Sequence, residues 1–496
     1  MNTALFDKIT KECIHLYPFK VNGDYFLFDT ESLKVASIPQ DIYNIISSII
    51  KNPVSLKNST LNESYFEEIY NFAKSRPVSL LKDTSCVLDR CGKFSDLKTL
   101  RDLTLIVCEA CNLKCEYCYL RDKLDKKTFM DRETCRRAID LFYQHADKYV
   151  HINFYGGEPL LNFDIIKYAT EYAVKTAGGY GISPSFGFVT NGTICNDEIL
   201  NHLTKYKFLI SISLDGPAEI HNRFRKFKSG ELTFDVIMKN IENYFSHYGN
   251  KEIIRFAPTI FYDNYNQLET IYDFFVELER KYGISFNAFS DIQYVIGKTL
   301  FSSNKANGFC TMLLEYGKLI WKEAKNEGKV DKLFTKVRIP PHFFKSIFRN
   351  KIATSKCGAG ISAMVVYPDG TITGCKQFDS ATVRGLDLSW GNVFKNEFND
   401  ELRLLPLKPT HTALPKACKS CFIKNICTSM CPGLAYYANG NFAEPDQRMC
   451  EVQKTFCKLS IWLVAKALKN RFSITNELLD YRITFGLRPS KDESSC

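Results

Sequence analysis

A regular alternation of strand-like and helix-like segments over residues 99–300 is the feature that most limits how this chain can fold. Short apolar runs rich in β-branched and aromatic residues predict six strands, over 103–107, 151–155, 185–189, 208–214, 253–260 and 286–294. Helical periodicity falls between them, over 131–145, 164–176, 197–204, 234–246 and 266–282. This alternation predicts an α/β fold with a parallel sheet, either a barrel or a doubly wound sheet, in which the helices are crossover connections.

The segments on either side of this block predict further units. Residues 1–98 predict a small module with a hairpin at Asn22-Gly23, a short strand over 33–37, and helices over 41–50 and 63–73. Such a module is either a packing or dimerisation appendage or a docking site whose strand edge takes up a peptide. Residues 301–345 predict a helical connector, 346–470 a Cys-rich domain that ends in an amphipathic helix from Leu459, and 471–496 a tail.

The cysteine content is the most informative part of the composition. The chain has 19 Cys in 496 residues, no apolar run of membrane length, and no recognisable secretory signal, so we expect a cytoplasmic protein without a membrane partner. Its net charge of +10 is spread along the chain and does not require a nucleic-acid partner. Because the cytoplasm keeps thiols reduced, this excess of cysteine indicates metal binding or catalysis and not disulfides.

Three cysteines directly follow the first predicted strand of the α/β block, in the spacing Cys111-x3-Cys115-x2-Cys118. Three thiolates in one short loop can hold a [4Fe–4S] cube and leave one iron open to another ligand. A zinc site would need a fourth ligand, which Cys108 could supply. Otherwise Cys108, at the end of a strand, is expected to be a small buried apolar residue.

This loop, with Tyr117 before its last cysteine, resembles the cluster loop of the radical S-adenosylmethionine (SAM) enzymes. Further motifs follow the next three predicted strands: Gly156-Gly157-Glu158-Pro159, Thr190-Asn191-Gly192 and Ser213-Leu214-Asp215-Gly216-Pro217. Each motif alone could be a turn. Together they predict one shared pocket, because ligand sites of parallel barrels collect at the carboxyl ends of the strands.

The resemblance implies a partial (β/α)6 TIM-like barrel with SAM bound at the open iron. It also implies a SAM-contacting role for Tyr117. Gly156, Gly157 and Glu158 would contact the amino group of SAM, and Asn191 and Ser213 its ribose or methionyl part. Arg223 or Arg225 would pair with its carboxylate, although each arginine could equally be a solvated surface charge. The implied reaction cleaves SAM to a 5′-deoxyadenosyl radical that takes hydrogen from a substrate, with an electron from a flavodoxin- or ferredoxin-type donor.

A second set of cysteines resembles the SPASM extension of these enzymes, which carries auxiliary [4Fe–4S] clusters. By this resemblance one cluster uses Cys418, Cys421, Cys427 and Cys450, and the other uses Cys357, Cys375 and Cys431. The second set lacks a fourth ligand, so either Cys310 completes it or an iron stays open for a substrate thiolate. A zinc ribbon formed by Cys418, Cys421, Cys427 and Cys431 is the alternative.

The first block, which contains HLYPFKVNGDYFLFDTESL, resembles the winged-helix-like leader-docking region of maturases that act on short Cys-rich ribosomal peptides. We therefore expect a peptide maturase that installs a cross-link, a Cys thioether, in a precursor peptide. An anaerobic sulfatase-maturing enzyme, which generates formylglycine, is the first alternative. It is disfavoured because Lys376 follows Cys375 where those enzymes usually carry Asp. The second alternative is a non-enzymatic, zinc-rich binding protein.

Overall fold

The protein is described from a computed structural model. It describes residues 15–30, 33–51, 92–118, 120, 128–247, 254–260, 264–282, 293–294, 303–327, 357–376, 378, 386–395, 397–407, 415–427 and 431–470. The predicted helix over 63–73, the second half of the connector and the tail over 471–496 lie outside these residues.

An eight-stranded sheet, in the order β13-β12-β11-β4-β5-β6-β7-β8, is the centre of the fold. Five strands that follow one another in sequence are parallel neighbours: β4 (Leu100–Cys108), β5 (Ala146–Gly156), β6 (Ser183–Thr190), β7 (Leu209–Ile212) and β8 (Ile254–Phe256). Short strands β9 (Thr259–Ile260) and β10 (Gln293–Tyr294) form a separate parallel pair. The predicted parallel α/β fold is confirmed.

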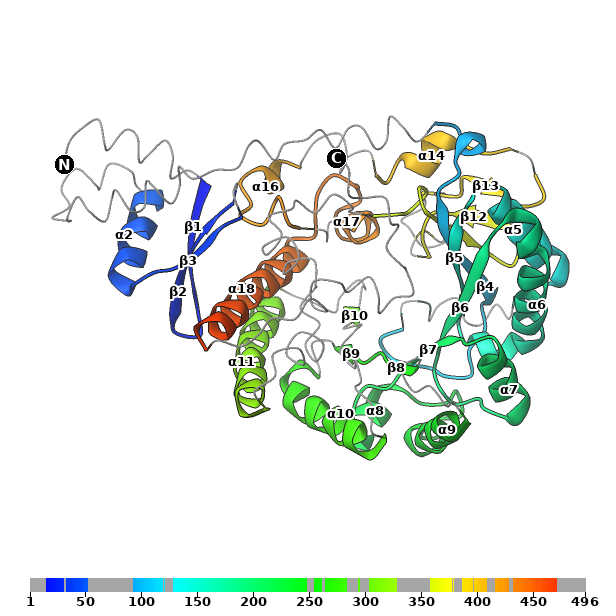
Figure 1. Ribbon diagram of the computed structural model, residues 1–496, viewed down its shortest axis with the longest axis horizontal. Helices are drawn as coiled ribbons and strands as arrows, with labels where there is room; N and C mark the ends of the chain where they lie inside the picture. The colour runs from blue at the N-terminus through cyan, green and yellow to red at the C-terminus, as the bar shows by residue number, and fades with distance from the viewer. Residues whose placement is uncertain are drawn as a thin grey trace.

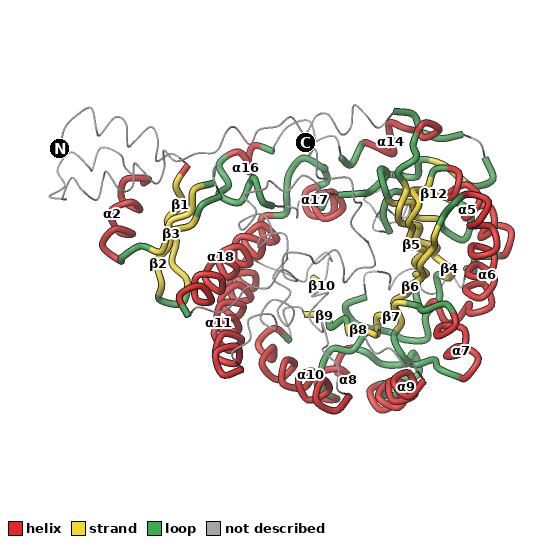
Figure 2. The backbone as a smooth tube through the Cα atoms, viewed as in Figure 1, coloured by secondary structure: helices red, strands yellow, loops and turns green. Residues whose placement is uncertain are grey.

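Helices follow these strands along the outer side of the sheet, as Figures 1 and 2 show. The predicted ones are α5 (Arg132–Gln144), α6 (Phe163–Tyr180), α7 (Asp197–Lys205), α9 (Phe234–His247) and α10 (Leu268–Tyr282). A short helix that the periodicity did not predict, α8 (Ala218–Phe224), follows β7. Short 3-10 turns lie at Phe94–Asp96, Pro159–Asn162 and Tyr265–Gln267. Because the helices are the crossovers, the carboxyl ends of the parallel strands all lie at one edge of the sheet.

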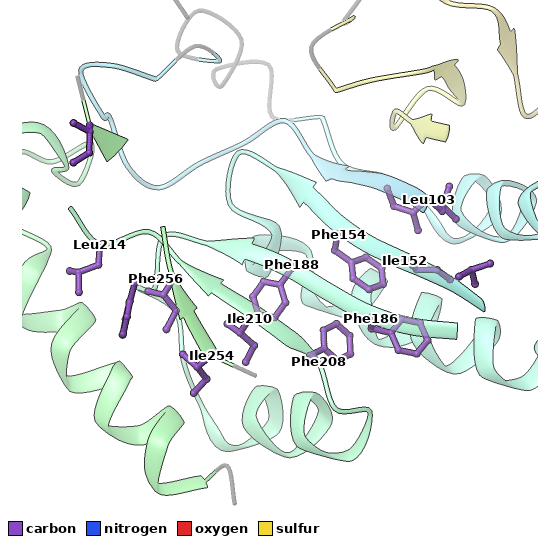
Figure 3. Packing of buried hydrophobic residues seen from close by; sticks show 14 of the residues in the cluster. Leu103, Ile152, Phe154, Phe186, Phe188, Phe208, Ile210, Leu214, Ile254 and Phe256 are labelled. Atoms are coloured by element: carbon purple, nitrogen blue, oxygen red, sulfur yellow. The ribbon is translucent and has the colours of Figure 1, made fainter. Parts of the chain in front are cut away.

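The two faces of the sheet differ in chemistry. Alternate side chains point toward the helices and form the core, with exposures of at most 4%: Leu103, Ile152, Phe154, Phe186, Phe188, Phe208, Ile210, Ile254 and Phe256 (Figure 3). The residues between them face inward, and Asp102, His151 and Ser185 stand side by side in the strand register. With Arg255 and several apolar residues they line a cavity of about 790 Å³, so charged and polar side chains gather on this face, whereas the core side chains named above are apolar.

Part of the Cys-rich region completes this sheet. Strand β11 (Ala363–Val366) pairs in parallel with β4, and β12 (Thr371–Thr373) and β13 (Gly391–Asn392) extend it with antiparallel pairing. This covers the edge of β4 that would otherwise expose unpaired backbone groups. The expected boundary at residue 346 therefore does not separate the strands of the two regions. Helices α14 (Asp400–Leu404), α16 (Lys416–Lys419) and α17 (Pro432–Asn439) belong to the same region.

The N-terminal module is a three-stranded antiparallel sheet with one described helix. Strands β1 (Leu16–Val21), β2 (Asp24–Asp29) and β3 (Val35–Ser37) pair in sequence order, and α2 (Gln40–Lys51) follows. The β1–β2 turn has φ values of 50° at Asn22 and 90° at Gly23. These left-handed conformations are the ones that an Asn-Gly hairpin requires, so the predicted hairpin is confirmed.

This module packs against the Cys-rich region and helix α18 (Gln447–Lys469), which runs beside α11 (Ser303–Glu327) (Figure 1). Tyr17 stacks on Phe422 with ring centroids 3.8 Å apart and planes 3° from parallel. Asn425 Nδ2 donates to Thr30 O at 2.8 Å, and Trp462 Nε1 donates to Asp24 Oδ2 at 2.8 Å. Although α11 and α18 are long, neither they nor any other described helix has the length and apolarity to cross a membrane.

Candidate cofactor site and cysteine groups

The loop that carries Cys111, Cys115 and Cys118 follows β4 and is held on two sides by backbone hydrogen bonds. At the end of β5, Gly157 N donates to Cys108 O at 3.0 Å and Glu158 N to Ala110 O at 2.9 Å. The segment after α8 holds the other side, through the bonds Lys114 N to Lys226 O (2.9 Å), Glu116 N to Phe224 O (3.1 Å) and Lys228 N to Asn112 O (3.0 Å). The loop is therefore fixed between residues 156–158 and 224–228.

Gly156 makes this close approach possible. Its φ is +147°, and a Cβ atom there would lie only 2.0 Å from the carbonyl oxygen of Cys108. The glycine thus permits a close backbone contact. The partner observed in the structure is the chain's own backbone at the start of the cysteine loop.

The three thiols of the loop lie near enough to interact electrostatically. Burial raises the pKa of Cys111 to about 12, and the neighbouring Cys115 and Cys118 contribute to this increase. Burial also raises the pKa of Cys115 to about 11, although the Arg225 guanidinium opposes it. A centre that supplies positive charge would offset the cost of three partly buried thiolates.

The environment of Cys108 bears on whether it could be a fourth ligand beside these thiols. Among the residues that the structure describes, no three Cys, His, Asp or Glu side chains are arranged to hold one metal ion. Cys108 is fully buried, and its Sγ donates to Glu158 O at 3.0 Å. It is therefore the buried strand-end residue that we predicted.

Glu158 joins the ends of two strands. Its side chain is 0% exposed; Oε1 accepts from Thr190 Oγ1 at 2.9 Å and from Leu160 N at 3.1 Å, and Oε2 accepts from Asn191 N at 2.6 Å. Burial raises the pKa of this carboxyl to about 7, and the three hydrogen bonds oppose that shift. Since these donors belong to the chain itself, a contact of Glu158 with the amino group of SAM stays a prediction.

The residues that follow β6 and β7 also lie beside the cysteine loop. Asn191 Nδ2 is 2.8 Å from Asn112 Oδ1 and 3.8 Å from Cys111 Sγ. Ser213 N donates to Thr190 O at 2.9 Å, which joins the ends of β6 and β7. The structure therefore brings Asn191 and the predicted strand-end motifs to one edge of the sheet, beside the first cysteine of the loop.

Arg225 and Tyr117 meet at a buried carboxylate that the sequence analysis did not single out. Arg225 Nε donates to Asp215 Oδ2 at 2.8 Å, the Tyr117 hydroxyl donates to the same oxygen, and Thr259 N donates to Asp215 Oδ1 at 2.9 Å. Burial disfavours the charge on Asp215, but Arg225 and the other neighbours lower its pKa overall. Asp215 could have been singled out from the sequence, because it lies in a motif that follows a strand and a buried carboxylate needs a cation as its partner.

The two arginines that the resemblance left open differ in environment. Arg225 is 7% exposed, and its guanidinium lies 5.2 Å from the centre of the Tyr117 ring. Arg223 is exposed and lies over the ring of Phe224 at 4.8 Å. Arg223 is therefore a charge at the protein surface, whereas Arg225 belongs to the buried site.

The cysteines of the second set form two groups. Burial raises the pKa of Cys450 to about 12, and the nearby Cys418, Cys427 and Cys421 contribute to this increase. Burial likewise raises the pKa of Cys357, with a contribution from Cys431. Cys357 and Cys375 pack against one small apolar cluster, composed of Ala359, Phe378, Leu388 and Phe442. Cys450 thus lies near Cys418, Cys421 and Cys427, and Cys357 lies near Cys431 and Cys375, whereas the roles of all seven as cluster ligands stay predictions.

Cys310 lies in the interface between α11 and α18. Burial raises the pKa of its thiol, and the other residues that shift this pKa, Thr455, Glu451 and Lys458, all lie on α18. This environment is that of a residue packed between helices. The open ligand position next to Cys357, Cys375 and Cys431 is therefore the alternative that we develop below.

Comparisons with known proteins match the part of the chain that carries this site. Residues 105–275 match the family model of the radical SAM superfamily. A cysteine-type anaerobic sulfatase-maturating enzyme of Clostridium perfringens is 25% identical over 337 residues, 65% of this chain and 85% of that protein. The radical SAM cyclopropyl synthase TigE of Paramaledivibacter caminithermalis is 26% identical over 269 residues, 48% of this chain and 53% of that protein.

The fold also matches a solved structure. The structure of anSMEcpe with bound AdoMet superposes with a TM-score of 0.60 at 20% identity, over 79% of this chain and 100% of that one. At this identity the likeness shows the fold alone. Two other curated relatives align over only 46% and 33% of their own length. The chain contains a radical SAM domain over residues 105–275, and this domain makes it an enzyme.

Proposed function

We propose that this enzyme modifies a ribosomally made precursor peptide and installs a cross-link in it, a Cys thioether. The observation that carries the proposal is the position of the N-terminal module. Tyr17 and Thr30 of the module contact Phe422 and Asn425, which lie between Cys421 and Cys427. A leader segment docked on the winged-helix-like module would therefore be held next to the Cys-rich region.

A radical SAM domain implies a [4Fe–4S] cluster and SAM as cofactors. Cys111, Cys115 and Cys118 would hold this cluster, and with SAM it supplies an acceptor strong enough to take hydrogen from an unactivated C–H bond. Gly156, Gly157, Glu158, Asn191, Ser213 and Arg225 would surround SAM, together with Tyr117. The inner face next to this site carries an apolar group of Ile106, Tyr155, Val365 and Tyr367, which limits the access of water.

The second set of cysteines would hold two auxiliary clusters. Cys418, Cys421, Cys427 and Cys450 would fully ligate one of them. Cys357, Cys375 and Cys431 would leave an iron of the other open to the thiolate of the substrate, because thiolates suit iron–sulfur centres. Thioether formation removes two hydrogen atoms from the peptide, so the auxiliary clusters would accept an electron and pass it to a flavodoxin- or ferredoxin-type carrier.

Lys376 supports a peptide cross-link over formylglycine formation. It follows Cys375, and its Nζ lies 3.9 Å from the centre of the Tyr155 ring, on the inner face of the sheet. A cation at this position cannot replace the carboxylate that would remove a proton from a sulfatase-type substrate. It can instead hold a negative group of the substrate.

The test uses a short Cys-rich peptide, to be sought in the reading frames next to the one that encodes this chain. With SAM and a reductant under anaerobic conditions, the enzyme should convert it to a product lighter by two hydrogen atoms, with the cross-link on a cysteine. Deletion of residues 1–95 should weaken binding of the peptide while SAM binding survives. A product without a new bond to sulfur, or unchanged affinity after the deletion, would contradict the proposal.

Sulfatase maturation is the second candidate, and the match to the Clostridium perfringens enzyme over 65% of this chain favours it. The two functions differ in their substrates. A peptide with Cys-x-Pro-x-Arg should be oxidised at its cysteine by a sulfatase maturase. Turnover of that peptide, with none on the neighbouring Cys-rich precursor, would decide for this second candidate.

A further inference from the structure

Asp215 is the centre of a buried polar group that reaches into the cysteine loop. It lies in the LDGP segment after β7, and its side chain is 0% exposed. Its two oxygens accept from Arg225, Tyr117 and Thr259, as described above. These three partners come from the segment after α8, the cysteine loop and strand β9, so one carboxylate joins three separate parts of the site.

A second layer of hydrogen bonds fixes the backbone of Arg225. The amide of Asp215 donates to His221 Nδ1 at 3.3 Å, and His221 Nε2 lies 3.0 Å from Thr233 Oγ1. The Thr233 hydroxyl in turn donates to Arg225 O at 2.8 Å. Arg225 is thus held at its backbone by Thr233 and at its guanidinium by Asp215 and by Thr259 Oγ1 at 3.3 Å. The positive charge of Arg225 is therefore held at a fixed position.

A contribution to the stability of the fold does not by itself explain why Asp215 and Arg225 are buried as an ion pair. Burying an ion pair costs the hydration of both groups, and well-packed apolar residues often serve a core equally well. The location of the pair suggests another use. Tyr117, one partner of Asp215, lies between Cys115 and Cys118, and its ring packs 5.2 Å from the Arg225 guanidinium. The nearby positive charge also acts on Cys115.

We propose that Asp215 is a positioning residue for the cluster that Cys111, Cys115 and Cys118 hold. It keeps Tyr117 and Arg225 in place, so that the loop between the last two cysteines is rigid and a fixed positive charge stands beside Cys115. Its own negative charge balances that positive charge and thereby keeps the reduction potential of the cluster low. This role concerns the cluster and is independent of which peptide the enzyme modifies.

The first test is the reduction potential of the cluster. In the anaerobically reconstituted full chain, the cluster is identified as the one whose electron paramagnetic resonance signal changes when SAM is added. Asp215→Asn removes the negative charge and leaves Arg225 uncompensated. We expect reduction to become at least about tenfold more favourable, a rise of about 59 mV for one electron. A potential equal to that of the wild type would overturn the proposal.

Tyr117→Phe tests the rigidity of the loop separately. It removes the hydrogen bond to Asp215 but keeps the ring and every charge. We expect iron to be lost from this cluster to a chelator several times faster than in the wild type, with the potential shifted much less than in Asp215→Asn. Wild-type iron loss in Tyr117→Phe would contradict the positioning role, and this result can be read even if Asp215→Asn fails to retain the cluster.

The chain contains a matched control. On α5, Asp140 accepts from the Tyr172 hydroxyl at 2.6 Å and from Arg136 Nη1 at 2.9 Å, so the same three residue types meet on the outer helices. Asp140→Asn and Tyr172→Phe should leave the potential and the rate of iron loss unchanged. Equal effects of the two Asp variants would show that the changes are unspecific and would overturn the proposal. Absence of a SAM-sensitive signal in the wild type would refute the cluster assignment itself.

Discussion

Replacement of Glu158 by Gln tests how the ends of the central strands are held together. Oε2 accepts from the amide of Asn191, and Oε1 accepts from the amide of Leu160 and the hydroxyl of Thr190. A Gln side chain has only one oxygen, so its NH2 group must face one of these two sets of donors. In either orientation at least one buried amide loses its acceptor.

The expected magnitude follows from that count. A buried donor without an acceptor costs about 1–3 kcal/mol. Because 1.4 kcal/mol corresponds to a factor of ten, local opening should become roughly fivefold to 150-fold more frequent. Hydrogen–deuterium exchange with mass spectrometry measures this opening directly. Peptides that contain Asn191 or Leu160 should exchange faster in Glu158→Gln, and peptides from α9 should not change.

Glu133→Gln is the control for this measurement. Glu133 lies on α5 and pairs with Arg136 and Arg137, and its side chain is 47% exposed. Its replacement should leave exchange at β5 and β6 as it is in the wild type. If both the Asn191 and the Leu160 peptides of Glu158→Gln keep their wild-type rates, Glu158 does not join the strand ends as we infer.

Three other predictions concern single side chains. Burial lowers the pKa of His202 to about 4, and its Nε2 has no hydrogen-bond partner in the described structure. Neutral His202 therefore contributes stability that is fully present above pH ~6.5 and is lost as the pH falls through about 4. His202→Phe should flatten the decrease in melting temperature over this pH range. A slope equal to that of the wild type would contradict this prediction. Gly156→Ala should lower the amount of iron bound by the first cysteine loop, because the added Cβ would lie 2.0 Å from Cys108 O. Gly178→Ala is the control and should retain the iron, because a Cβ at that position has no atom within 4 Å. Equal iron content in both variants would contradict the steric argument. Trp462→Phe removes the donor to Asp24 and should loosen the N-terminal module by about 1 kcal/mol, seen as faster limited proteolysis between residues 30 and 92; a wild-type rate speaks against this contact.

The elements of the fold were predictable from the sequence where the pattern is local. The Asn22-Gly23 hairpin and the alternating strands and helices follow from turn chemistry and side-chain periodicity. Strand β11 was not assigned to the central sheet because its four residues carry no sign of their partner, and only the tertiary structure places it beside β4. Helix α8 escaped prediction because seven residues are too short for a clear helical period.

The features of the site were likewise predictable only where the sequence pattern is local. Cysteine spacing indicated which thiols gather, and Cys108 was correctly expected to be buried at the end of β4. The partners of Glu158 and Arg225 could not be read from spacing. Thr190 lies 32 residues from Glu158 and meets it because β5 and β6 are neighbours in the sheet, whereas Asp215 lies 10 residues before Arg225 and meets it across α8. The match to the radical SAM superfamily and the matched maturases indicate an enzyme, against the non-enzymatic alternative.

The most direct test of this account is SAM cleavage by the anaerobically purified, reconstituted chain and its Cys115→Ala variant. The wild type should show the spectrum of iron–sulfur clusters and release 5′-deoxyadenosine when SAM and a strong reductant are added. Cys115→Ala should keep the absorbance of the auxiliary clusters but release none. Formation of 5′-deoxyadenosine by the variant, or its absence from an iron-loaded wild type, would contradict the central claim that Cys111, Cys115 and Cys118 hold the SAM-cleaving cluster.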